Sequence, residues 1–298
     1  MPMFTAAHPD CVEYDKSSDV FAVGMYELED DRRRGGVKCI KLNDAGDLIE
    51  DWELLTDFGV LDLRWTNDSS MVCACSDGSV RLVKPAAQSD VSSQIRVSES
   101  TDHKGVVMGV DGADGSYTTL TTGGSLSFLN FNENGLIETG RVQAHNSMFE
   151  SWSVAKNKNT IVTGSDDCCM NFWDLRTFEK AATNSKTHSM GVTAFLFRDE
   201  FNLLSGSYDD QLREWDIRNI SKPVKIAATR GGIWRIKKYK EEQILIAACY
   251  GGAEIWDKDL SVRVREFDDH KSMVYGISSD QLGHIVSCSF YDNLVCKW

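Results

Sequence analysis

Five short stretches, far apart in the 298-residue sequence, carry side chains that could bind a cation or move a proton. They are VLDLRW (60–65), HNSMFESW (145–152), HSMGV (188–192), GGIWRIK (231–237) and HKSMVYG (270–276). Aromatic rings hold cations over their faces, carboxylates and histidines accept protons, and a guanidinium stabilises a developing negative charge. The side chains with these abilities are Asp62, Glu150, Trp152, His188, Trp234, Arg235 and Tyr275. They can act together only if the fold brings all five stretches to one place.

A repeated unit in the second half of the chain predicts such a fold. GSDDCCMNFWDLR (164–176) is followed by GSYDDQLREWDIRN (206–219), and the unit ends at tryptophans 41 or 42 residues apart, namely Trp173, Trp215, Trp256 and Trp298. Each unit contains short apolar runs separated by Gly, Asp or Asn, which indicates strands joined by tight turns. Four strands in each period of about 40 residues are typical of a β-propeller.

Weaker copies extend the repeat toward the N-terminus and bring the number of units to seven. The predicted fold is therefore an all-β, seven-bladed propeller forming a single domain over residues 1–298. The predicted blades span 9–48, 58–90, 103–138, 145–180, 188–222, 231–262 and 270–298. Because Trp298 falls in the third strand of the last blade, MFTAA (3–7) is expected to supply the fourth strand and to close the ring, which removes an open sheet edge.

The turns before the tryptophans contain a recurring aspartate. Asp167, Asp209 and Asp292 each precede a tryptophan by six residues, and a histidine stands in each preceding loop, at His145, His188 and His270. These units resemble WD40 repeats, in which the turn aspartate is hydrogen-bonded with a histidine, a serine or threonine, and the indole. A buried charge is tolerated when it is paired in this way. His188 therefore has two interpretations, as a scaffold histidine or as a proton acceptor.

In a propeller of this kind, the innermost strand of every blade starts at the same mouth of the central channel. The five stretches named above fall at these starts, where the repeat itself needs only small or apolar residues. Aromatic and charged side chains that converge there are typical of a binding site. The alternative is that Trp152 and Trp234 pack between blades.

Composition excludes several other classes of protein. The formal net charge of −13 disfavours a phosphate backbone as partner, so no nucleic-acid binding is expected. No apolar run is long enough to span a membrane, and no secretory signal is visible at the start, which favours a cytoplasmic location. The nine cysteines form no C-x-x-C pair and are expected to be buried small apolar residues in a reducing compartment. A closed propeller is self-sufficient, so a monomer is expected.

A search for enzyme signatures gives a mostly negative result. The sequence has no G-x-S-x-G elbow, phosphate-binding loop, H-E-x-x-H motif or dinucleotide fingerprint. The run DDCCM (166–170) mixes carboxylates and thiols, but its position in the turn before Trp173 favours a structural role. No metal and no cofactor are therefore expected.

Several stretches together carry a closer resemblance. AHNSMFESW, HSMGV, GSYDDQLREWDIRN, GGIWRIK, LIAACY and HKSMVYG, with CVEY, FAVGMYELE and VLDLRW near the N-terminus, are similar to the diphthine methyl ester hydrolase (diphthine methylesterase) family, the WD-repeat proteins of diphthamide biosynthesis. The third unit, with TGGSLSFL, lacks the turn aspartate and the tryptophan, and KKY stands where relatives carry a WHP sequence.

The resemblance implies a carboxylic ester hydrolase. Its substrate would be the methyl ester of methylated diphthine on translation elongation factor 2, and its product diphthine for the final amidation. Trp152, Trp234 and Tyr275 would form a cage for the trimethylammonium group, and Glu150 or Asp62 would add negative charge. Arg235 would stabilise the oxyanion, Glu150 or else His188 would be the base, and Cys11 is a further possible nucleophile. Two alternatives stay open, a non-catalytic WD40 scaffold and a reader of methylated lysine.

Overall fold

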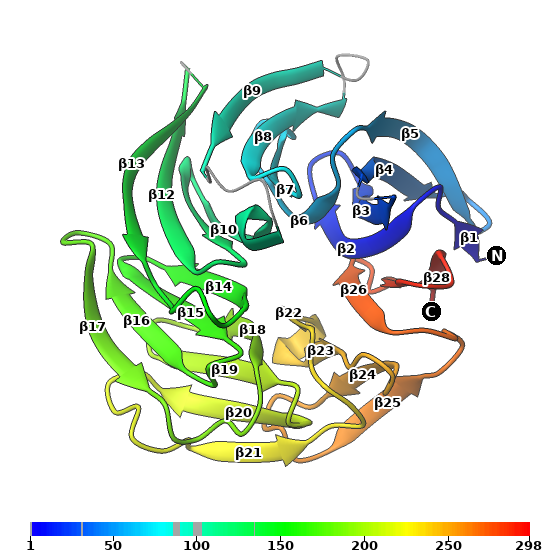
Figure 1. Ribbon diagram of the computed structural model, residues 1–298. Helices are drawn as coiled ribbons and strands as arrows, with labels where there is room; N and C mark the ends of the chain where they lie inside the picture. Colours follow the sequence, from blue (N-terminus) through cyan, green and yellow to red (C-terminus); the bar gives the residue numbers. More distant parts are fainter. Residues whose placement is uncertain (1, 31, 86–89, 98–102, 134) are drawn as a thin grey trace.

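The computed structural model describes residues 2–30, 32–85, 90–97, 103–133 and 135–298. Seven four-stranded antiparallel sheets are arranged around a central axis, as Figure 1 shows. Six sheets follow the chain from the axis outward, so each is a meander whose first strand lies nearest the axis. This arrangement confirms the predicted all-β, seven-bladed propeller.

The strands divide among the blades as follows. Blade 1 contains β2 (His8–Asp15), β3 (Val20–Glu29), β4 (Arg32–Leu42) and β5 (Leu48–Thr56). Blade 2 contains β6 (Val60–Trp65), β7 (Met71–Cys75), β8 (Ser79–Lys84) and β9 (Asp90–Arg96). Blade 3 contains β10 (Val107–Ala113), β11 (Ser116–Thr121), β12 (Ser125–Asn132) and β13 (Gly135–Gln143). Blade 4 contains β14 (Ser151–Asn157), β15 (Thr160–Ser165), β16 (Met170–Asp174) and β17 (Glu179–Asn184).

The remaining blades complete the circle. Blade 5 contains β18 (Val192–Phe197), β19 (Asn202–Ser207), β20 (Gln211–Asp216) and β21 (Lys225–Ala228). Blade 6 contains β22 (Arg235–Lys238), β23 (Ile244–Ala247), β24 (Ala253–Trp256) and β25 (Arg263–Phe267). Blade 7 contains β26 (Val274–Ser279), β27 (Ile285–Ser289), β28 (Leu294–Lys297) and the N-terminal β1 (Met3–Phe4). Two short 3₁₀ helices are η2 (His103–Gly105) and η3 (Lys240–Glu242).

The outermost strands extend beyond the predicted blade ranges. Blade 1 ends at Thr56 rather than at residue 48, and blade 5 ends at Ala228 rather than at 222. These strands lie on the rim and bury few side chains; β17, for example, is exposed at four of its six positions. The apolar pattern that marks the inner strands is therefore missing from the outer ones.

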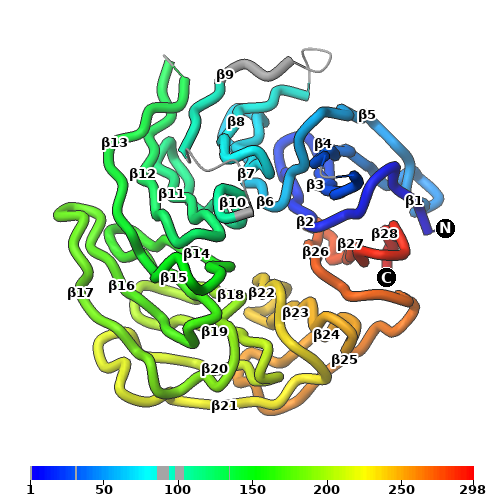
Figure 2. Tube along the Cα trace, viewed as in Figure 1, coloured from blue at the N-terminus to red at the C-terminus, as the bar shows by residue number. Residues whose placement is uncertain are grey.

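Apolar packing between neighbouring blades holds the ring together. Seven clusters of buried side chains lie between neighbouring blades, one at each of the seven contacts. At the contact that closes the ring, Val12 and Phe21 of blade 1 pack with Val286 and Val295 of blade 7. Figure 2 shows these first and last blades side by side. The ring is therefore closed by a core as well as by strand pairing.

The N-terminal strand completes blade 7, as predicted. Met3 pairs with Val295 and Phe4 pairs with Leu294, so β1 is the outer strand of this sheet. The strand is shorter than the expected range 3–7, because Thr5 already leaves the ladder to hydrogen-bond the Asn293 carbonyl.

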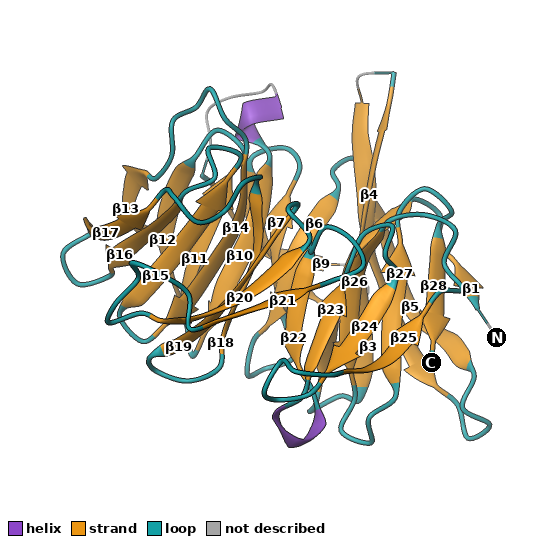
Figure 3. Ribbon diagram, turned by 90° about the horizontal axis from the view of Figure 1, so that it is seen from below, coloured by secondary structure: helices purple, strands orange, loops and turns teal. Residues whose placement is uncertain are grey.

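The two faces of the ring differ. The innermost strands begin at one face, called the mouth face below, where His8 of β2 pairs with Tyr26 of β3. Beyond this pair the β3–β4 hairpin continues and projects from the ring, as Figure 3 shows. The helix η2 lies at the same face, and η3 lies at the opposite face.

The recurring turn residues form the expected hydrogen bonds. In blade 4, His145 Nδ1 lies 2.9 Å from Asp167 Oδ2, His145 Nε2 lies 2.9 Å from Thr163 Oγ1, and Trp173 donates to Thr163 at 3.3 Å. Blades 5 and 7 carry related networks. Blade 6 differs, because Trp256 donates to the fully buried Glu254 carboxylate at 2.6 Å. The repeated residues are scaffold.

Candidate functional site

A β-bulge recurs where the innermost strands begin at the mouth face. In six of these strands one residue has no partner in the ladder, and Trp234 occupies the corresponding position just before β22. A bulge re-aims the extra side chain and is frequent near functional sites. The seven residues, called the mouth ring below, are Asp10, Leu61, Met108, Trp152, Thr193, Trp234 and Tyr275.

Aromatic side chains from several blades meet at the mouth ring. Trp234 stacks on Tyr275 with ring centroids 4.5 Å apart, and its centroid lies 5.7 Å from that of Trp152 and 5.9 Å from that of Tyr208. Tyr26 of β3 packs against the same cluster. The structure therefore brings together Trp152, Trp234 and Tyr275, and it adds two tyrosines that sequence reasoning missed.

Burial separates the roles of these rings. Trp234 is only 4% exposed and forms the floor of the cluster, which agrees in part with the packing alternative for this residue. Trp152, Tyr208 and Tyr275 are half-buried and present ring surface around that floor. The Trp152 indole donates to Asp166 Oδ1 at 2.7 Å, which fixes its orientation. A cation can contact the half-buried rings without displacing the floor.

The next residue along each innermost strand forms a second ring, one step deeper in the channel. Its charged members are Asp62 and Arg235, whose Oδ1 and Nη2 atoms lie 3.6 Å apart. Arg64 lies 3.0 Å from Asp62 and also pairs with Glu13 and Asp111. Burial opposes ionisation of Asp62, but Arg64 and Arg235 lower the pKa of its carboxyl below the usual value. Asp62 is therefore an ion-pair partner of Arg64 and Arg235 inside the channel, one step below the aromatic rings to which it was expected to add charge.

Arg235 lies between the aromatic floor and this ion-pair network. Its Nη2 donates to the Leu61 carbonyl at 3.1 Å, and its guanidinium carbon lies 5.9 Å from the Trp234 ring centroid. Although burial opposes the charge, Asp62 and Asp10 raise the pKa of Arg235. A cavity of about 30 Å³ borders Arg235, Trp152 and Trp234 and has room for about one or two water molecules. The guanidinium is therefore a fixed positive charge directly beneath the aromatic cluster.

Glu150 lies on the loop that leads into β14. Its backbone carbonyl accepts hydrogen bonds from the Ser165 hydroxyl at 2.8 Å and from the Asp166 amide at 2.8 Å. The side chain is half-buried, and its charge contributes to the raised pKa of Tyr208. Glu150 therefore lies at the rim of the aromatic cluster.

His188 has the scaffold role. Its Nε2 lies 2.9 Å from the Ser205 hydroxyl, and its Nδ1 accepts from Arg213 at 2.9 Å. Burial lowers its pKa, against the opposing influence of Asp209. With both ring nitrogens engaged in the blade 5 turn, His188 is corrected from a candidate base to a structural residue.

Asp10 is a functional candidate that sequence reasoning missed. It is the charged member of the mouth ring, it is 3% exposed, and its Oδ1 has no hydrogen-bond partner. Burial raises the pKa of Asp10 to about 7, while Arg235 lowers it and Asp62 raises it. The signal was hidden because blade 1 is one of the weak repeats, and HPDC (8–11) matches none of the clear copies.

The neighbouring thiol is less suited to chemistry. Cys11 follows Asp10 in the second ring and is 1% exposed. Burial, with Asp62 and Asp10 nearby, raises the pKa of Cys11 well above that of a free thiol. A thiolate is the reactive form of cysteine, so this environment disfavours Cys11 as a nucleophile.

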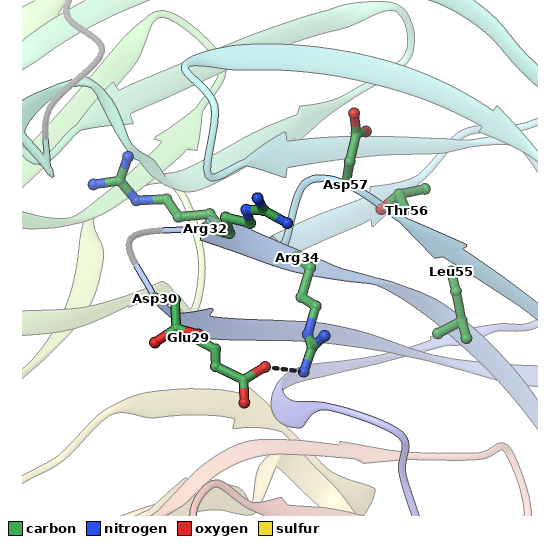
Figure 4. A pocket seen from close by; sticks show the side chains of 8 residues that line it. Glu29, Asp30, Arg32, Arg34, Leu55, Thr56 and Asp57 are labelled. Carbon is green, nitrogen blue, oxygen red and sulfur yellow. Dashed lines mark hydrogen bonds and ion pairs between the residues drawn. The ribbon is translucent and has the colours of Figure 1, made fainter.

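Other features of the described residues lie apart from this site. A hollow of about 830 Å³ lies at the tip of the β3–β4 hairpin, where Arg34 and Glu29 form an ion pair of 2.5 Å (Figure 4). It is lined mainly by charged side chains and contains no aromatic ring.

Among the described residues, no three His, Cys, Asp or Glu side chains gather as a metal site. No helix in that part of the chain has the length and apolar character to cross a bilayer.

Comparisons with known proteins agree with this architecture. The family model of the WD domain, G-beta repeat, matches residues 53–84 and 138–174. A chain of the Mitotic Checkpoint Complex crystal structure superposes with a TM-score of 0.79 at 15% identity, covering 100% of this chain and 90% of that one. The WD40 propeller domain of Doa1 gives a TM-score of 0.76 at 16% identity, covering 99% and 95%. These likenesses concern the fold alone.

Curated relatives give a more specific result. A Schizosaccharomyces pombe protein named diphthine methyltransferase is 24% identical over 94% of this chain and 90% of its own length. A Dictyostelium discoideum homologue of that name is 24% identical over 97% and 95%. The human protein of that name is 37% identical over 36% of this chain and 25% of its own length.

Proposed function

We propose that this chain, a WD-repeat relative of the proteins named diphthine methyltransferase, removes the methyl group from the methyl ester of diphthine in diphthamide biosynthesis. The reaction is the hydrolysis of a carboxylic ester on a modified protein side chain. The protein substrate is translation elongation factor 2, and the site of action is the cytoplasm. The product carboxylate is then available for amidation.

The observation that supports this reaction is the composition of the mouth. Diphthine carries a fixed trimethylammonium group beside its ester. The half-buried rings of Trp152, Tyr208 and Tyr275 surround the Trp234 floor, and each cation–aromatic contact contributes about 0.5–2 kcal/mol. A carboxylate at the rim, Glu150, adds attraction for the cation. The aromatic cluster therefore suits a cation that cannot donate hydrogen bonds.

The same arrangement supplies a charge for the reacting ester. An ester carbonyl bound at the edge of the Trp234 floor, toward the cavity that Trp234 and Arg235 both border, lies near the guanidinium that Asp62 holds from below. A positive charge fixed before the reaction stabilises the oxyanion of the tetrahedral intermediate. In this proposal Glu150, named from the sequence as a candidate base, binds the cation.

The surface around the mouth suits a protein substrate. Exposed apolar side chains stand on mouth-face loops of blades 4 to 7, at Met148, Phe149, Met190, Tyr250 and Tyr291. Exposed apolar side chains repeated on one face around an opening favour contact with a protein. The net charge of −13 favours a basic partner surface. This surface equally fits a non-catalytic scaffold, so the test must measure chemistry.

A mass measurement tests the reaction. Purified protein is incubated with elongation factor 2 that carries the diphthine methyl ester, and the modified peptide is weighed. Hydrolysis lowers its mass by about 14 Da, whereas methyl transfer to diphthine raises it by the same amount. An unchanged mass would leave only a scaffold role.

A variant separates binding from packing. Trp152→Ala is expected to weaken substrate binding about 3- to 30-fold, the equivalent of about one cation–aromatic contact. Trp152→Phe retains a ring and should restore most of the binding. If Trp152→Ala unfolds at a much lower temperature and binds normally when folded, Trp152 is a packing residue.

A further inference from the structure

We propose that Asp10 is the general base of the ester hydrolysis, receiving a proton from the attacking water and returning it to the leaving methanol. The inference rests on the proposed function and adds a residue to it. The sequence directed attention to Glu150 instead, because the first blade lacks a clear repeat signature.

Asp10 differs in charge from the rest of the mouth ring. Six of the seven mouth-ring residues are Leu61, Met108, Trp152, Thr193, Trp234 and Tyr275, none of which carries a charge. The seventh is Asp10, displayed by the bulge between Pro9 and Cys11. A carboxylate is thus placed at the level of the aromatic rings, one step above Arg235. A bulge is a means of aiming one side chain at a site.

The carboxyl group of Asp10 is able to accept a further hydrogen bond. Asp10 is nearly fully buried, its Oδ1 has no hydrogen-bond partner, and no described Lys or Arg nitrogen lies within 4 Å of it. The indole nitrogen of Trp234, which is near enough to affect its pKa, is likewise without a hydrogen bond of normal geometry. Buried carboxyl groups are normally paired. A buried acceptor atom that lies beside the aromatic cluster and makes no hydrogen bond is available to a water or a substrate atom.

The groups around Asp10 complete the site. Trp234 adjoins both Asp10 and Arg235, so a carbonyl bound at the edge of the indole lies near both the base and the guanidinium. Arg235, Asp62, Cys11, Cys288, Tyr208 and Tyr275 are the titratable groups coupled to Asp10. Burial raises the pKa values of both thiols and both phenols, so these groups stay neutral near pH 7. Asp10 is the member of this set whose charge changes in that range.

The steps balance as follows. A water molecule adds to the ester carbonyl carbon while the Asp10 carboxylate takes one of its protons. Arg235 stabilises the resulting oxyanion. The bond from the carbonyl carbon to the methoxy oxygen then breaks, and the departing oxygen takes the proton from Asp10. The products are one carboxylic acid and one methanol, and Asp10 is again a carboxylate.

The test compares two carboxylates and a control in the full-length chain, with methylated elongation factor 2 as substrate. Asp10→Asn keeps the shape of the side chain and should lower kcat at least about 100-fold while binding changes less than about 3-fold. Glu150→Gln should mainly raise KM. Asp259→Asn, an exposed position at the opposite face, should match the wild type.

The pH profile gives a readout that a structural role would not produce. Because the carboxylate is the active form, kcat/KM of the wild type should rise with pH and level off above about 7, following Asp10. In Asp10→Glu the base is retained, so partial activity and a displaced profile are expected.

The outcomes are distinct. An active wild type with a normally active Asp10→Asn variant overturns this inference and leaves the proposed function standing. Loss of kcat in Glu150→Gln with retention in Asp10→Asn assigns the base to Glu150. An inactive wild type overturns the proposed function and the assignment of Asp10 together. If Asp10→Asn fails to fold, an Asp10→Glu variant with the wild-type profile contradicts the inference.

Discussion

Two buried aspartates near the mouth differ in their pairing and therefore in their pKa values. Asp10 is buried with only the Trp234 indole beside it and with no basic side chain paired to it, whereas Asp62, equally buried, is paired with Arg64 and Arg235. The pairing lowers the pKa of Asp62, and its absence leaves burial to raise the pKa of Asp10. The pKa values of these two buried carboxyl groups therefore shift in opposite directions, because only Asp62 is paired with basic side chains.

This difference predicts a pH-dependent stability change in Asp10→Asn. The unfolded chain releases the Asp10 proton near its ordinary pKa of 3.8, while the folded protein retains it to about pH 7. The folded state of the wild type therefore loses stability as pH rises through this window, by about 4 kcal/mol in total. Asparagine has no such penalty. Urea unfolding should show the variant's advantage growing by about 2–3 kcal/mol between pH 5 and pH 8. A difference that does not vary with pH would contradict the burial of an ionisable Asp10.

At this scale the sequence predicted the aromatic residues but not their division of labour. Trp152, Trp234 and Tyr275 were identified because the repeat has no use for them at those positions. Trp234 forms the floor and Tyr208 forms a wall because of how their rings pack. The spacing of residues in the sequence does not specify this packing. His188 shows the reverse case, since its loop position fits two roles and only the contacts with Ser205 and Arg213 distinguish them.

Among the elements, the innermost strands position the site and the outer strands complete each sheet. The period of the tryptophans predicted the inner three strands well because these bury regular apolar faces. The fourth strands were truncated in the predicted ranges because their side chains meet solvent. The bulges were not predicted, since an unpaired residue leaves no mark in an alternating pattern.

The N-terminal strand gives a prediction about ring closure. Deleting residues 2–7 removes the β1–β28 pairing, the Thr5 hydrogen bond to Asn293 and the buried Ala7. The melting temperature is expected to fall by about 5 °C or more, since a loss of about 1 kcal/mol corresponds to about 2 °C in a chain of this size. Phe4→Ser is the control, because that side chain is 69% exposed and should change the midpoint little. An unaltered midpoint in the deletion variant would show that packing between blades 7 and 1 closes the ring unaided.

The whole molecule presents an acidic ring with one projecting hairpin. The chain carries 45 acidic and 32 basic side chains, and three of the basic ones are consecutive on the hairpin, at Arg32, Arg33 and Arg34. Figure 4 shows Arg34 directed to Glu29 across the hairpin. A partner that covers the mouth meets this arm on one side only, which restricts its rotation about the axis.

Salt should therefore weaken the binding of the protein substrate without changing the rate of the chemical step. Raising the salt concentration from about 50 to about 300 mM shortens the Debye length about 2.4-fold, which weakens the attraction between an acidic enzyme and a basic partner. KM for elongation factor 2 is expected to rise severalfold, while kcat stays nearly constant. A small methyl ester that carries a trimethylammonium group serves as the control and should show little change in KM. Equal salt responses for the two substrates would place the recognition inside the pocket alone.

The ring of bulges has a consequence for how such a molecule can change. Each bulge displays one side chain at the opening from a position that no cross-strand partner requires, so replacing that side chain leaves the sheet hydrogen bonds intact. The six bulge positions and Trp234 thus form a common frame with one exchangeable side chain per blade, although the packed rings of Trp152, Trp234 and Tyr275 depend on one another. A new specificity can arise by exchanging one of these side chains, without rebuilding the propeller.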